Sequence, residues 1–279
     1  MNSYAYYNGK FGKKEEILIP LSDRSVFFGD AIYDAAIGSY DRILWEDEHI
    51  ERFLLNAKKL GIGHSLTKSF LSALLREVAV KSMIKSYFIY FQLSRDLINR
   101  SHSAINAGSN MLITVDPIEI KKDFIPLKLM TVRDKRYDLC HIKTTNLLPA
   151  VLASTKAEKL GFDEAIFVRG NTVTECSKSN IAIIKQGRVI THPKTNRILP
   201  GITREHLHLI CKELSIEFCE KKFTVSDMLS ADEILVTSTS KLCKTASFIN
   251  SQKVGGNNPD LANLICSRFF LEYSEFCQI

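Results

Sequence analysis

Two stretches in the second half of the chain decide how the sequence is interpreted: HIKTTNLL at residues 141–148 and TECSKSNI at residues 174–181. The first contains a single lysine, Lys143, among apolar and small neighbours. The second contains a single carboxylate, Glu175, followed by hydroxyl groups and an amide. These two side chains, an amine and a carboxylate, are the starting point for predicting the chemistry of the protein.

An amine and a carboxylate of this kind are what a protein needs to use pyridoxal phosphate. The amine can form a Schiff base, and the carboxylate can pair with the ring nitrogen and keep it protonated. We expect Ile142, Leu147 and Leu148 to desolvate Lys143, which would disfavour its charge and free the amine. Lys143 taken alone is much better explained as a surface lysine.

Glu175 taken alone is better explained as an ordinary glutamate at the end of a strand. The spacing of Glu175, Ser177 and Asn180 favours a functional role, because a hydroxyl and an amide can fix the geometry of a carboxylate.

Composition and charge indicate a globular protein. The 279 residues are 45% hydrophobic and 24% charged, which suits one large or two ordinary domains. The net charge of +6 is scattered, so it favours small anionic ligands over nucleic acid. Seven cysteines without C-x-x-C spacing argue against a disulfide framework or a zinc ribbon. With no signal peptide and no membrane-spanning run, the sequence predicts a soluble cytoplasmic protein without a metal site or a membrane partner.

The apolar pattern predicts strands first, then a mixture of helices and strands. Expected strands are Tyr4–Tyr7, Glu16–Pro20, Ala31–Ser39, Ile43–Trp45, Ser86–Ser94, Met111–Val115, Leu127–Val132, Glu164–Val168, Val173, Asn180–Ile184, Val189–Thr191 and Glu233–Thr237. Expected helices are Glu48–Leu60 with Gly61 as a cap, Thr67–Met83, Leu147–Leu160, Thr203–Leu214 and Pro259–Phe276. The lack of strict alternation favours an α+β fold, and the lack of G-x-G-x-x-G after a strand argues against a Rossmann nicotinamide site.

A charged, proline-containing stretch near residue 117 predicts a boundary between two domains. We expect an N-terminal domain at residues 1–118, a linker at 119–123 and a C-terminal domain at 124–279.

Three segments could bind a phosphate group. Gly201-Ile202-Thr203 opens an expected helix, where backbone amides can approach an anion at its positive end. Thr237-Ser238-Thr239-Ser240 is a hydroxyl-rich strand end. Arg52 could form a bidentate clamp on its helix. Each segment is also compatible with a plain junction, a polar turn or a solvated helix face.

The order of these segments resembles that of the fold-type IV, class IV pyridoxal phosphate transaminases, and most closely the D-amino acid (D-alanine) transaminases among them. The matching stretches extend over nearly the whole chain. They are Tyr7–Gly9, Asp23-Arg24, Phe28–Asp30, Glu48–Arg52, Ile142-Lys143, Asn146–Leu148, Asn171–Glu175, Thr191–Pro193, Gly201–Arg204 and Val236–Thr239.

The resemblance implies a fold and a cofactor site. It implies a smaller N-terminal α+β domain, a larger C-terminal β-barrel-like domain with helices, and pyridoxal 5'-phosphate between them. Lys143 would carry the Schiff base and transfer the proton, and Glu175 would hold the pyridinium. The residues implied to bind phosphate are Arg52, Ile202, Thr203, Ser238 and Thr239.

The resemblance also implies a substrate site shared between two subunits. Tyr33 would line it, and Arg100 and His102 would reach in from the partner of a homodimer to bind the substrate carboxylate. The chain departs from the family pattern at Asp96–Asn99, where a turn with glycine and proline is expected, and at Lys178, where serine is usual. A lysine at position 178 could favour acidic substrates, or it could face solvent.

The predicted function is therefore transfer of the amino group of a D-amino acid, of the D-alanine or D-glutamate type, to a 2-oxo acid by a ping-pong mechanism. Within the family the alternatives are a branched-chain L-amino acid transaminase and an aminodeoxychorismate lyase. Arg100 and His102 argue against both. A cofactor-binding protein without turnover is a further alternative, which the intact Lys143 and Glu175 disfavour.

Overall fold

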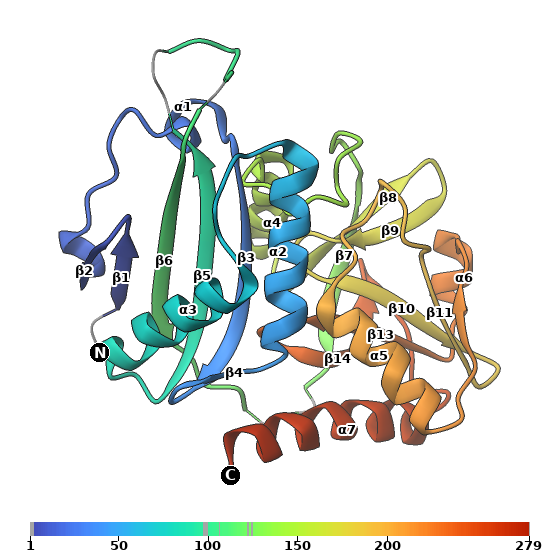
Figure 1. The fold of residues 1–279 in the computed structure, drawn as a ribbon. Helices are drawn as coiled ribbons and strands as arrows, with labels where there is room; N and C mark the ends of the chain where they lie inside the picture. The colour runs from blue at the N-terminus through green and yellow to red at the C-terminus, as the bar shows by residue number, and fades with distance from the viewer. Residues whose placement is uncertain (1–2, 97–99, 106, 122, 124, 279) are drawn as a thin grey trace. The chain divides into compact units, whose positions relative to one another are not determined.

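The computed structural model describes residues 3–96, 100–105, 107–121, 123 and 125–278 (Figure 1). The chain forms two compact units. Unit 1 comprises residues 1–120 and 142–146, and unit 2 comprises residues 121–141 and 147–279. The domain boundaries expected from the sequence remain a prediction, and residue 122 of the expected linker lies outside the described residues. The units differ from that prediction in one respect, because the segment 142–146, with Lys143, packs with unit 1.

Unit 1 is built on a six-stranded antiparallel sheet in the order β2-β1-β6-β5-β3-β4. Apolar side chains alternate along the central strand β5, where Tyr87, Ile89, Phe91 and Leu93 are buried, as expected for a strand with one face on a core. The strands are β1 (Tyr4–Tyr7), β2 (Lys10–Lys13), β3 (Ala31–Ser39), β4 (Arg42–Ile43), β5 (Ser86–Arg95) and β6 (Ser109–Pro117).

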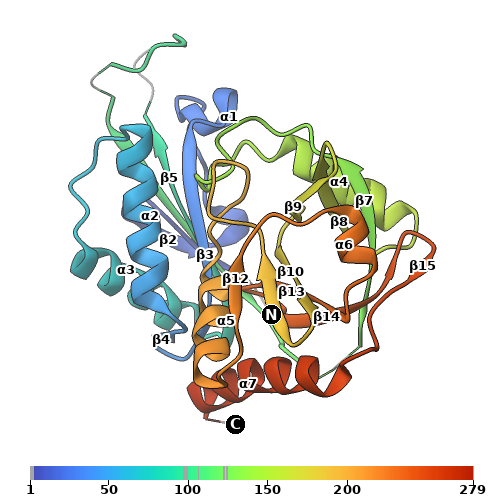
Figure 2. The same ribbon diagram turned by 90° about the vertical axis from the view of Figure 1, so that its right-hand side faces the viewer.

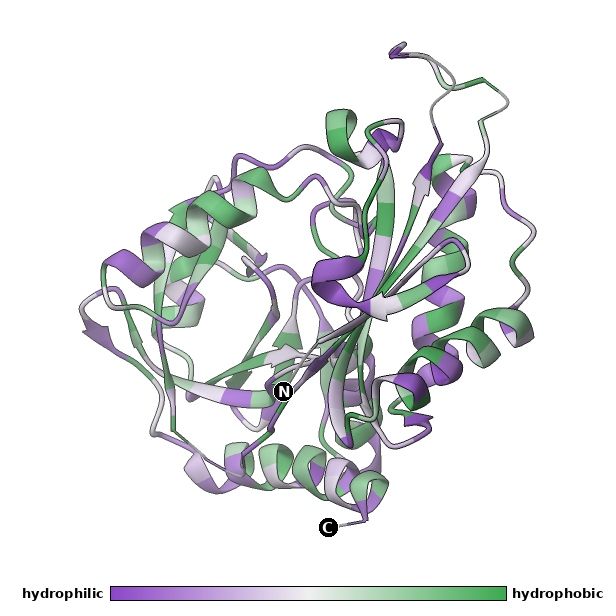
Figure 3. Ribbon diagram, turned by 90° about the vertical axis from the view of Figure 1, so that its left-hand side faces the viewer, coloured by the Kyte–Doolittle hydropathy of each residue, from purple (hydrophilic) through white to green (hydrophobic). Residues whose placement is uncertain are grey.

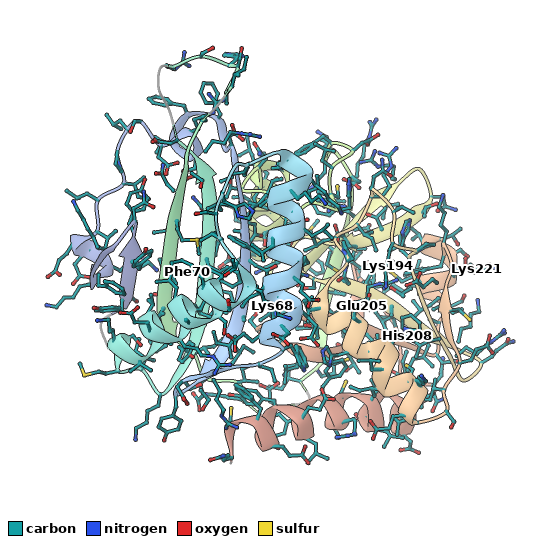
Figure 4. All side chains as sticks on the ribbon, in the orientation of Figure 1. Lys68, Phe70, Lys194, Glu205, His208 and Lys221 are labelled. Atoms are coloured by element: carbon teal, nitrogen blue, oxygen red, sulfur yellow. The ribbon has the colours of Figure 1, made fainter. Side chains whose placement is uncertain are left out.

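Helices α2 (Glu46–Leu60) and α3 (Lys68–Ser82) cover one face of this sheet (Figures 1 and 2). Both place apolar residues at helical spacing in the core, and Figure 3 shows apolar and polar residues alternating along helices and strands alike. Gly61 ends α2 in the left-handed conformation, which confirms its predicted role as a cap. Lys68 joins the two helices through Asp47 and Glu51 at 3.2 and 2.7 Å (Figure 4).

The start of unit 1 corrects one prediction. The strand expected at Glu16–Pro20 is wrong, because β1 pairs at once with β2, Tyr7 opposite Lys10. Asn8 and Gly9 both have positive φ, 43° and 91°, which closes a two-residue hairpin turn. The partner strand of β1 therefore begins at Lys10 and not at Glu16. The chain continues through the 3-10 turn η1 (Lys14–Glu16) and the short helix α1 (Arg24–Phe28), neither of which the sequence predicted.

Unit 2 contains a nine-stranded mixed sheet in the order β12-β11-β10-β13-β14-β7-β8-β9, with β15 paired to β14. The sheet curls so that β9 also lies beside β10, which agrees with the predicted barrel-like form (Figure 2). The strands are β7 (Leu127–Arg133), β8 (Glu164–Arg169), β9 (Thr172–Cys176), β10 (Asn180–Lys185), β11 (Arg188–Thr191), β12 (Phe218–Glu220), β13 (Glu233–Ser238), β14 (Leu242–Ile249) and β15 (Gln252–Lys253).

The described residues of unit 2 include four helices. Helix α4 (Leu148–Lys159) packs on β7 and β8, and α5 (Ile202–Glu213) and α7 (Pro259–Cys277) pack together against the strands β13 and β14. The fourth is α6 (Val225–Leu229). The sequence did not predict α6, β12, β14 or β15. Strand β14 was not predicted because a bulge between Ala246 and Phe248 breaks the alternation of apolar residues on which strand prediction depends.

The α+β class predicted from the sequence is confirmed. All seven cysteines are free thiols in the structure. Among the described residues, no helix combines the length and the apolar character that crossing a membrane would need.

Candidate active site

Lys143 lies in a short extended segment that adds to the edge of β3. The amide of Tyr33 donates to the Lys143 carbonyl at 2.9 Å, and the amide of Thr145 donates to the Ala31 carbonyl at 3.1 Å. Ile32 and Thr144 form an antiparallel bridge between these two bonds. The sheet of unit 1 therefore fixes the backbone from Lys143 to Thr145.

The end of this segment is fixed to the glycine that ends α1. The side chains of Thr145 and Asn146 both donate to the Gly29 carbonyl, at 2.9 and 2.8 Å. Gly29 has a φ of +59°, and a Cβ there would approach Asn146 Oδ1 to 2.8 Å. Only glycine therefore allows this close approach without strain.

The surroundings of the Lys143 amine include an aromatic pair. The amine lies 4.5 Å from the centre of the Tyr33 ring, which is stacked on Tyr90 at 5.2 Å. Ile142 is buried, as expected, whereas Leu147 and Leu148 are 40% and 68% exposed, and their expected part in desolvating the amine stays a prediction. An aromatic face attracts a cation, so Tyr33 holds the lysine side chain in place.

Arg52, on α2, is held by a carboxylate that the sequence did not suggest. Its Nε and Nη2 donate to the two oxygens of Asp34, each at 2.8 Å. His49, one turn earlier on α2, contacts the same carboxylate through Nδ1 at 2.8 Å. Asp34 follows Tyr33 on β3, and successive residues of a strand point to opposite faces. One short stretch of β3 therefore positions both Lys143 and Arg52.

The charges in this cluster are strongly coupled. Burial alone would raise the pKa of Asp34, but Arg52 and His49 hold it well below its usual value, so the carboxylate is ionised. Burial lowers the pKa of His49 despite the opposing effect of Asp34, and Arg52 and Lys143 lower it further. The neutral imidazole donates from Nδ1 to Asp34, and its buried Nε2 has no hydrogen-bond partner among the described residues.

Glu175, at the end of β9 in unit 2, accepts hydrogen bonds from Arg136, Asn180 and Leu199. Arg136 donates from Nη1 to Oε1 of Glu175. Oε2 accepts from the Asn180 side chain and from the Leu199 amide, both at 3.0 Å. The predicted help from Asn180 is therefore present, whereas the buried Ser177 hydroxyl has no hydrogen-bond partner among the described residues.

Arg136 was missed by the sequence analysis. It is largely buried, stacks on the Phe167 ring at 4.1 Å and also donates to the buried Asp134. Burial opposes its charge, but Glu175 and Asp134 raise its pKa above the usual value. A permanent positive charge thus faces Glu175. No sequence signal distinguishes Arg136 from neighbouring basic residues.

Lys178 has an exposed side chain, and its backbone amide donates to Glu164 at 2.8 Å. The structure thus agrees with the alternative in which Lys178 faces solvent.

The N-terminus of α5 lies directly beside the residues that hold Glu175. No side chain caps this helix, whose N-cap is Gly201, so the amides of Ile202 and Thr203 open the helix without a side-chain acceptor. A Cβ on Gly201 would come within 2.1 Å of Asn180 Oδ1, so only glycine fits. Asn180 also pairs in register with Thr237, so the hydroxyl-rich end of β13 begins at the same place.

The first turn of α5 also carries a partly exposed acidic residue, Glu205. Glu205 forms an ion pair with Lys194 at 2.6 Å (Figure 4).

The predicted carboxylate-binding residues Arg100 and His102 are exposed and belong to unit 1. Residues 97–99 of the altered turn before them lie outside the described residues. The predicted residues thus separate by unit: Lys143, Tyr33, Arg52, Arg100 and His102 in unit 1, and Glu175, Ile202, Thr203, Ser238 and Thr239 in unit 2.

Several solved structures share this fold. A branched-chain aminotransferase from Thermoproteus uzoniensis matches with a TM-score of 0.88 and 21% identity, covering 100% of this chain and 98% of that one. The branched-chain amino acid aminotransferase of Escherichia coli matches with a TM-score of 0.86 and 20% identity over 97% and 95% of the two chains. At this identity the similarity establishes the fold alone.

The family follows from the sequence match. Residues 32–246 match the model of the amino-transferase class IV family, and the chain belongs to that family. A D-alanine aminotransferase of Staphylococcus epidermidis is 35% identical over 258 residues, which is 91% of this chain and 89% of the relative. That of Bacillus licheniformis is 33% identical over 91% and 90% of the two chains. The family predicted from the sequence is confirmed.

Proposed function

We propose that this class IV aminotransferase moves the amino group of a D-amino acid to a 2-oxo acid with pyridoxal 5'-phosphate as cofactor. The observation that carries the proposal is the identity of 33–36% with D-alanine aminotransferases across most of both chains. The branched-chain and lyase alternatives have weaker support, because the branched-chain enzymes resemble this chain at 19–21% identity and a putative 4-amino-4-deoxychorismate lyase resembles it at 24%.

The residues present fit the proposed cofactor. The uncapped start of α5 offers the amides of Ile202 and Thr203 to a phosphate, where a helix N-terminus favours an anion. Arg52 would add its guanidinium, which Asp34 already orients, and Ser238 and Thr239 would add hydroxyls. Glu175 would hold the ring nitrogen, with Arg136 and Asn180 fixing its carboxylate.

The bound cofactor supplies an electron-withdrawing ring that accepts the negative charge left when the substrate Cα loses a proton. In this proposal Lys143 takes up that proton and returns it at the neighbouring carbon of the cofactor. Tyr33 lines the substrate site and holds the lysine amine near its ring face at 4.5 Å. Both half-reactions use the same groups, so ping-pong kinetics follow.

We further propose that the protein acts as a homodimer in the cytoplasm. Helix α4 carries an exposed apolar stripe of Leu148, Val151 and Leu152, at the spacing of one helix face, with exposed fractions of 68%, 53% and 62%. A stripe of this kind marks a surface for a partner, and a second copy would cover it. Exposed Arg100 and His102 would then reach the substrate carboxylate in the partner's site. Seven free thiols favour a reducing compartment.

The test is turnover of paired substrates by the purified protein with pyridoxal phosphate and 2-oxoglutarate. We expect D-alanine to react and L-leucine to react far more slowly. Lys143→Ala should lower turnover by about a thousandfold or more, whereas Lys128→Ala, an exposed lysine of unit 2, should have no effect. Exclusive turnover of L-leucine would support the branched-chain alternative, and pyruvate release from aminodeoxychorismate would support the lyase.

A further inference from the structure

We propose that Arg24 is a positioning residue that aims the substrate-binding loop Arg100-Ser101-His102, with Phe28 as its second contact. The inference deepens the proposed function and rests on it, because Arg100 and His102 are the groups proposed to bind the substrate carboxylate.

Arg24, on α1, joins the loop to the sheet of unit 1 through its guanidinium. Nη1 donates to the Ser101 carbonyl at 2.6 Å, and Nη2 donates to the His102 carbonyl at 3.0 Å. Nε donates to Asp30 at 2.8 Å. The side chain is only 5% exposed, so these bonds are protected from water. A planar guanidinium can hold two successive carbonyls in a fixed geometry, which a lysine ammonium cannot do.

The base of this connection is rigid. Asp23, the N-cap of α1, accepts from the Ser25 amide at 2.8 Å, and its other oxygen accepts from Tyr7, Ser94 and Asn110 of three strands. Asp23 is 1% exposed. Its bonds therefore fix the start of α1, and with it Arg24, to the body of the sheet.

Asp30 gives a second link to the same sheet. It accepts from Arg24 and, at 3.1 Å, from Nε of Arg95 at the end of β5. The two arginines thus share one carboxylate. The Arg24 guanidinium is held at Nε by Asp30 and at Nη1 and Nη2 by the loop carbonyls.

Phe28, at the end of α1, fixes the side chains that Arg24 does not touch. Its ring lies 5.4 Å from the His102 ring in an edge-to-face arrangement, and the Arg100 guanidinium lies 5.7 Å from its centre. The Arg24 guanidinium covers the same ring at 4.4 Å. The backbone of the loop is therefore held by Arg24, and both proposed carboxylate-binding side chains contact Phe28.

The contacts with α1 fix the position of the loop that carries Arg100 and His102. Residues 100–105 contain no helix or strand, so hydrogen bonds from other elements must fix their position. The contacts from α1 supply a geometry that does not depend on a glycine- and proline-bearing turn. An aligned pair of groups on a rigid support binds a carboxylate with less entropy loss.

The experiment compares Arg24→Lys and Phe28→Leu with the wild-type holoenzyme. For Arg24→Lys we expect KM for D-alanine to rise about tenfold or more, because charge-assisted bonds that hold the loop are lost. The inhibition constant of acetate, a simple carboxylate, should rise by a similar factor, and kcat should stay within about threefold. Amide hydrogen exchange in residues 100–105, measured without substrate, should become faster.

Arg76→Lys is the matched control, since Arg76 also forms an arginine–carboxylate pair within unit 1, with Glu46 at 2.6 Å. It should leave KM, the acetate constant and the loop exchange unchanged. An unchanged KM and acetate constant in Arg24→Lys, or a fall in kcat with KM unaltered, would overturn the inference. If Arg24→Lys does not fold, the same measurements on Phe28→Leu decide. A wild-type protein that does not turn over D-alanine removes the proposed function and this inference with it.

Discussion

Two buried arginine–carboxylate pairs, one in each unit, each contain one residue that we propose binds the cofactor. In unit 1 the proposed ligand-binding group is the arginine, Arg52, and the carboxylate that orients it is Asp34. In unit 2 the proposed ligand-binding group is the carboxylate, Glu175, and the arginine that orients it is Arg136. In both pairs the sequence analysis found the residue proposed to touch the ligand and missed its counter-ion.

The comparison teaches what a buried charge requires. A charged side chain taken out of water is stable only when a partner and further hydrogen bonds compensate it. Asp34 has His49 as an additional partner, and Glu175 has Asn180 and the Leu199 amide. The ligand-binding residue and its counter-ion therefore depend on each other. Removing the counter-ion should lower stability nearly as much as removing the ligand-binding residue.

The largest effect is expected at Arg136. Arg136→Met leaves the buried carboxylates of Glu175 and Asp134 without their shared cation, and it should lower the free energy of unfolding by about 3–5 kcal/mol. Urea unfolding of the cofactor-free protein measures this change. The double variant Arg136→Met/Glu175→Gln should recover part of the loss, because one uncompensated charge is removed.

The exposed pair of Arg188 and Glu217, at 3.9 Å, provides the control for this experiment. Arg188→Met should change the unfolding free energy by less than about 1 kcal/mol. Equal effects at Arg136 and Arg188 would show that the buried pair in unit 2 contributes no more than a surface contact.

A smaller effect should follow from the pH dependence of the cluster in unit 1. Burial lowers the pKa of His49 below its ordinary value of 6.5, so below that pH the unfolded chain binds a proton that the folded chain does not. The unfolded state then holds more protons, and stability must fall as pH falls below 6.5 towards the folded pKa. Asp34 adds a separate loss at lower pH, below its ordinary value of 3.8.

The variant His49→Gln should flatten the slope of stability against pH between neutrality and pH 5. A residual slope is expected, because burial also lowers the pKa of His192 in unit 2. Urea titrations at a series of pH values provide the measurement. An identical slope in wild type and variant would mean that His49 does not titrate differently in the folded and unfolded states.

The smallest effect is expected at Lys178. Its side chain is exposed and the bond from its backbone amide to Glu164 does not need the lysine, so Lys178→Ser should alter stability by less than about 0.5 kcal/mol. The ratio of D-glutamate to D-alanine turnover should not change. A shift of that ratio would restore the hypothesis that Lys178 selects acidic substrates.

Much of the fold could be predicted because period and turn residues are local signals. The apolar period predicted α2, α3, α5 and α7 to within a few residues, and Gly61 predicted the end of α2. The strand expected at Glu16–Pro20 failed because the pairing of β1 with β2 depends on how two residues turn. Strand β14 was missed because its bulge removes the local alternation.

The residues of the candidate site also divide into those that the sequence predicted and those that it did not. The lysine, the glutamate and the glycine-led helix start are recognisable from residue type and order, because their chemistry belongs to single residues. Their supports come from distant positions: Asp34 is 18 residues from Arg52, Arg136 is 39 from Glu175, and Arg24 is 77 from Ser101. No local pattern links residues so far apart.

By itself, the sequence determined the α+β class, most of the helices and strands, and the family to which the chain belongs. Only the tertiary structure decided which charges compensate one another, that Tyr33 lies against the Lys143 amine, and that α1 holds the loop of Arg100 and His102. The physical reason is that propensity and apolar period act between neighbours in the chain. Compensation of a buried charge acts between neighbours in space, and these exist only after the strands have paired.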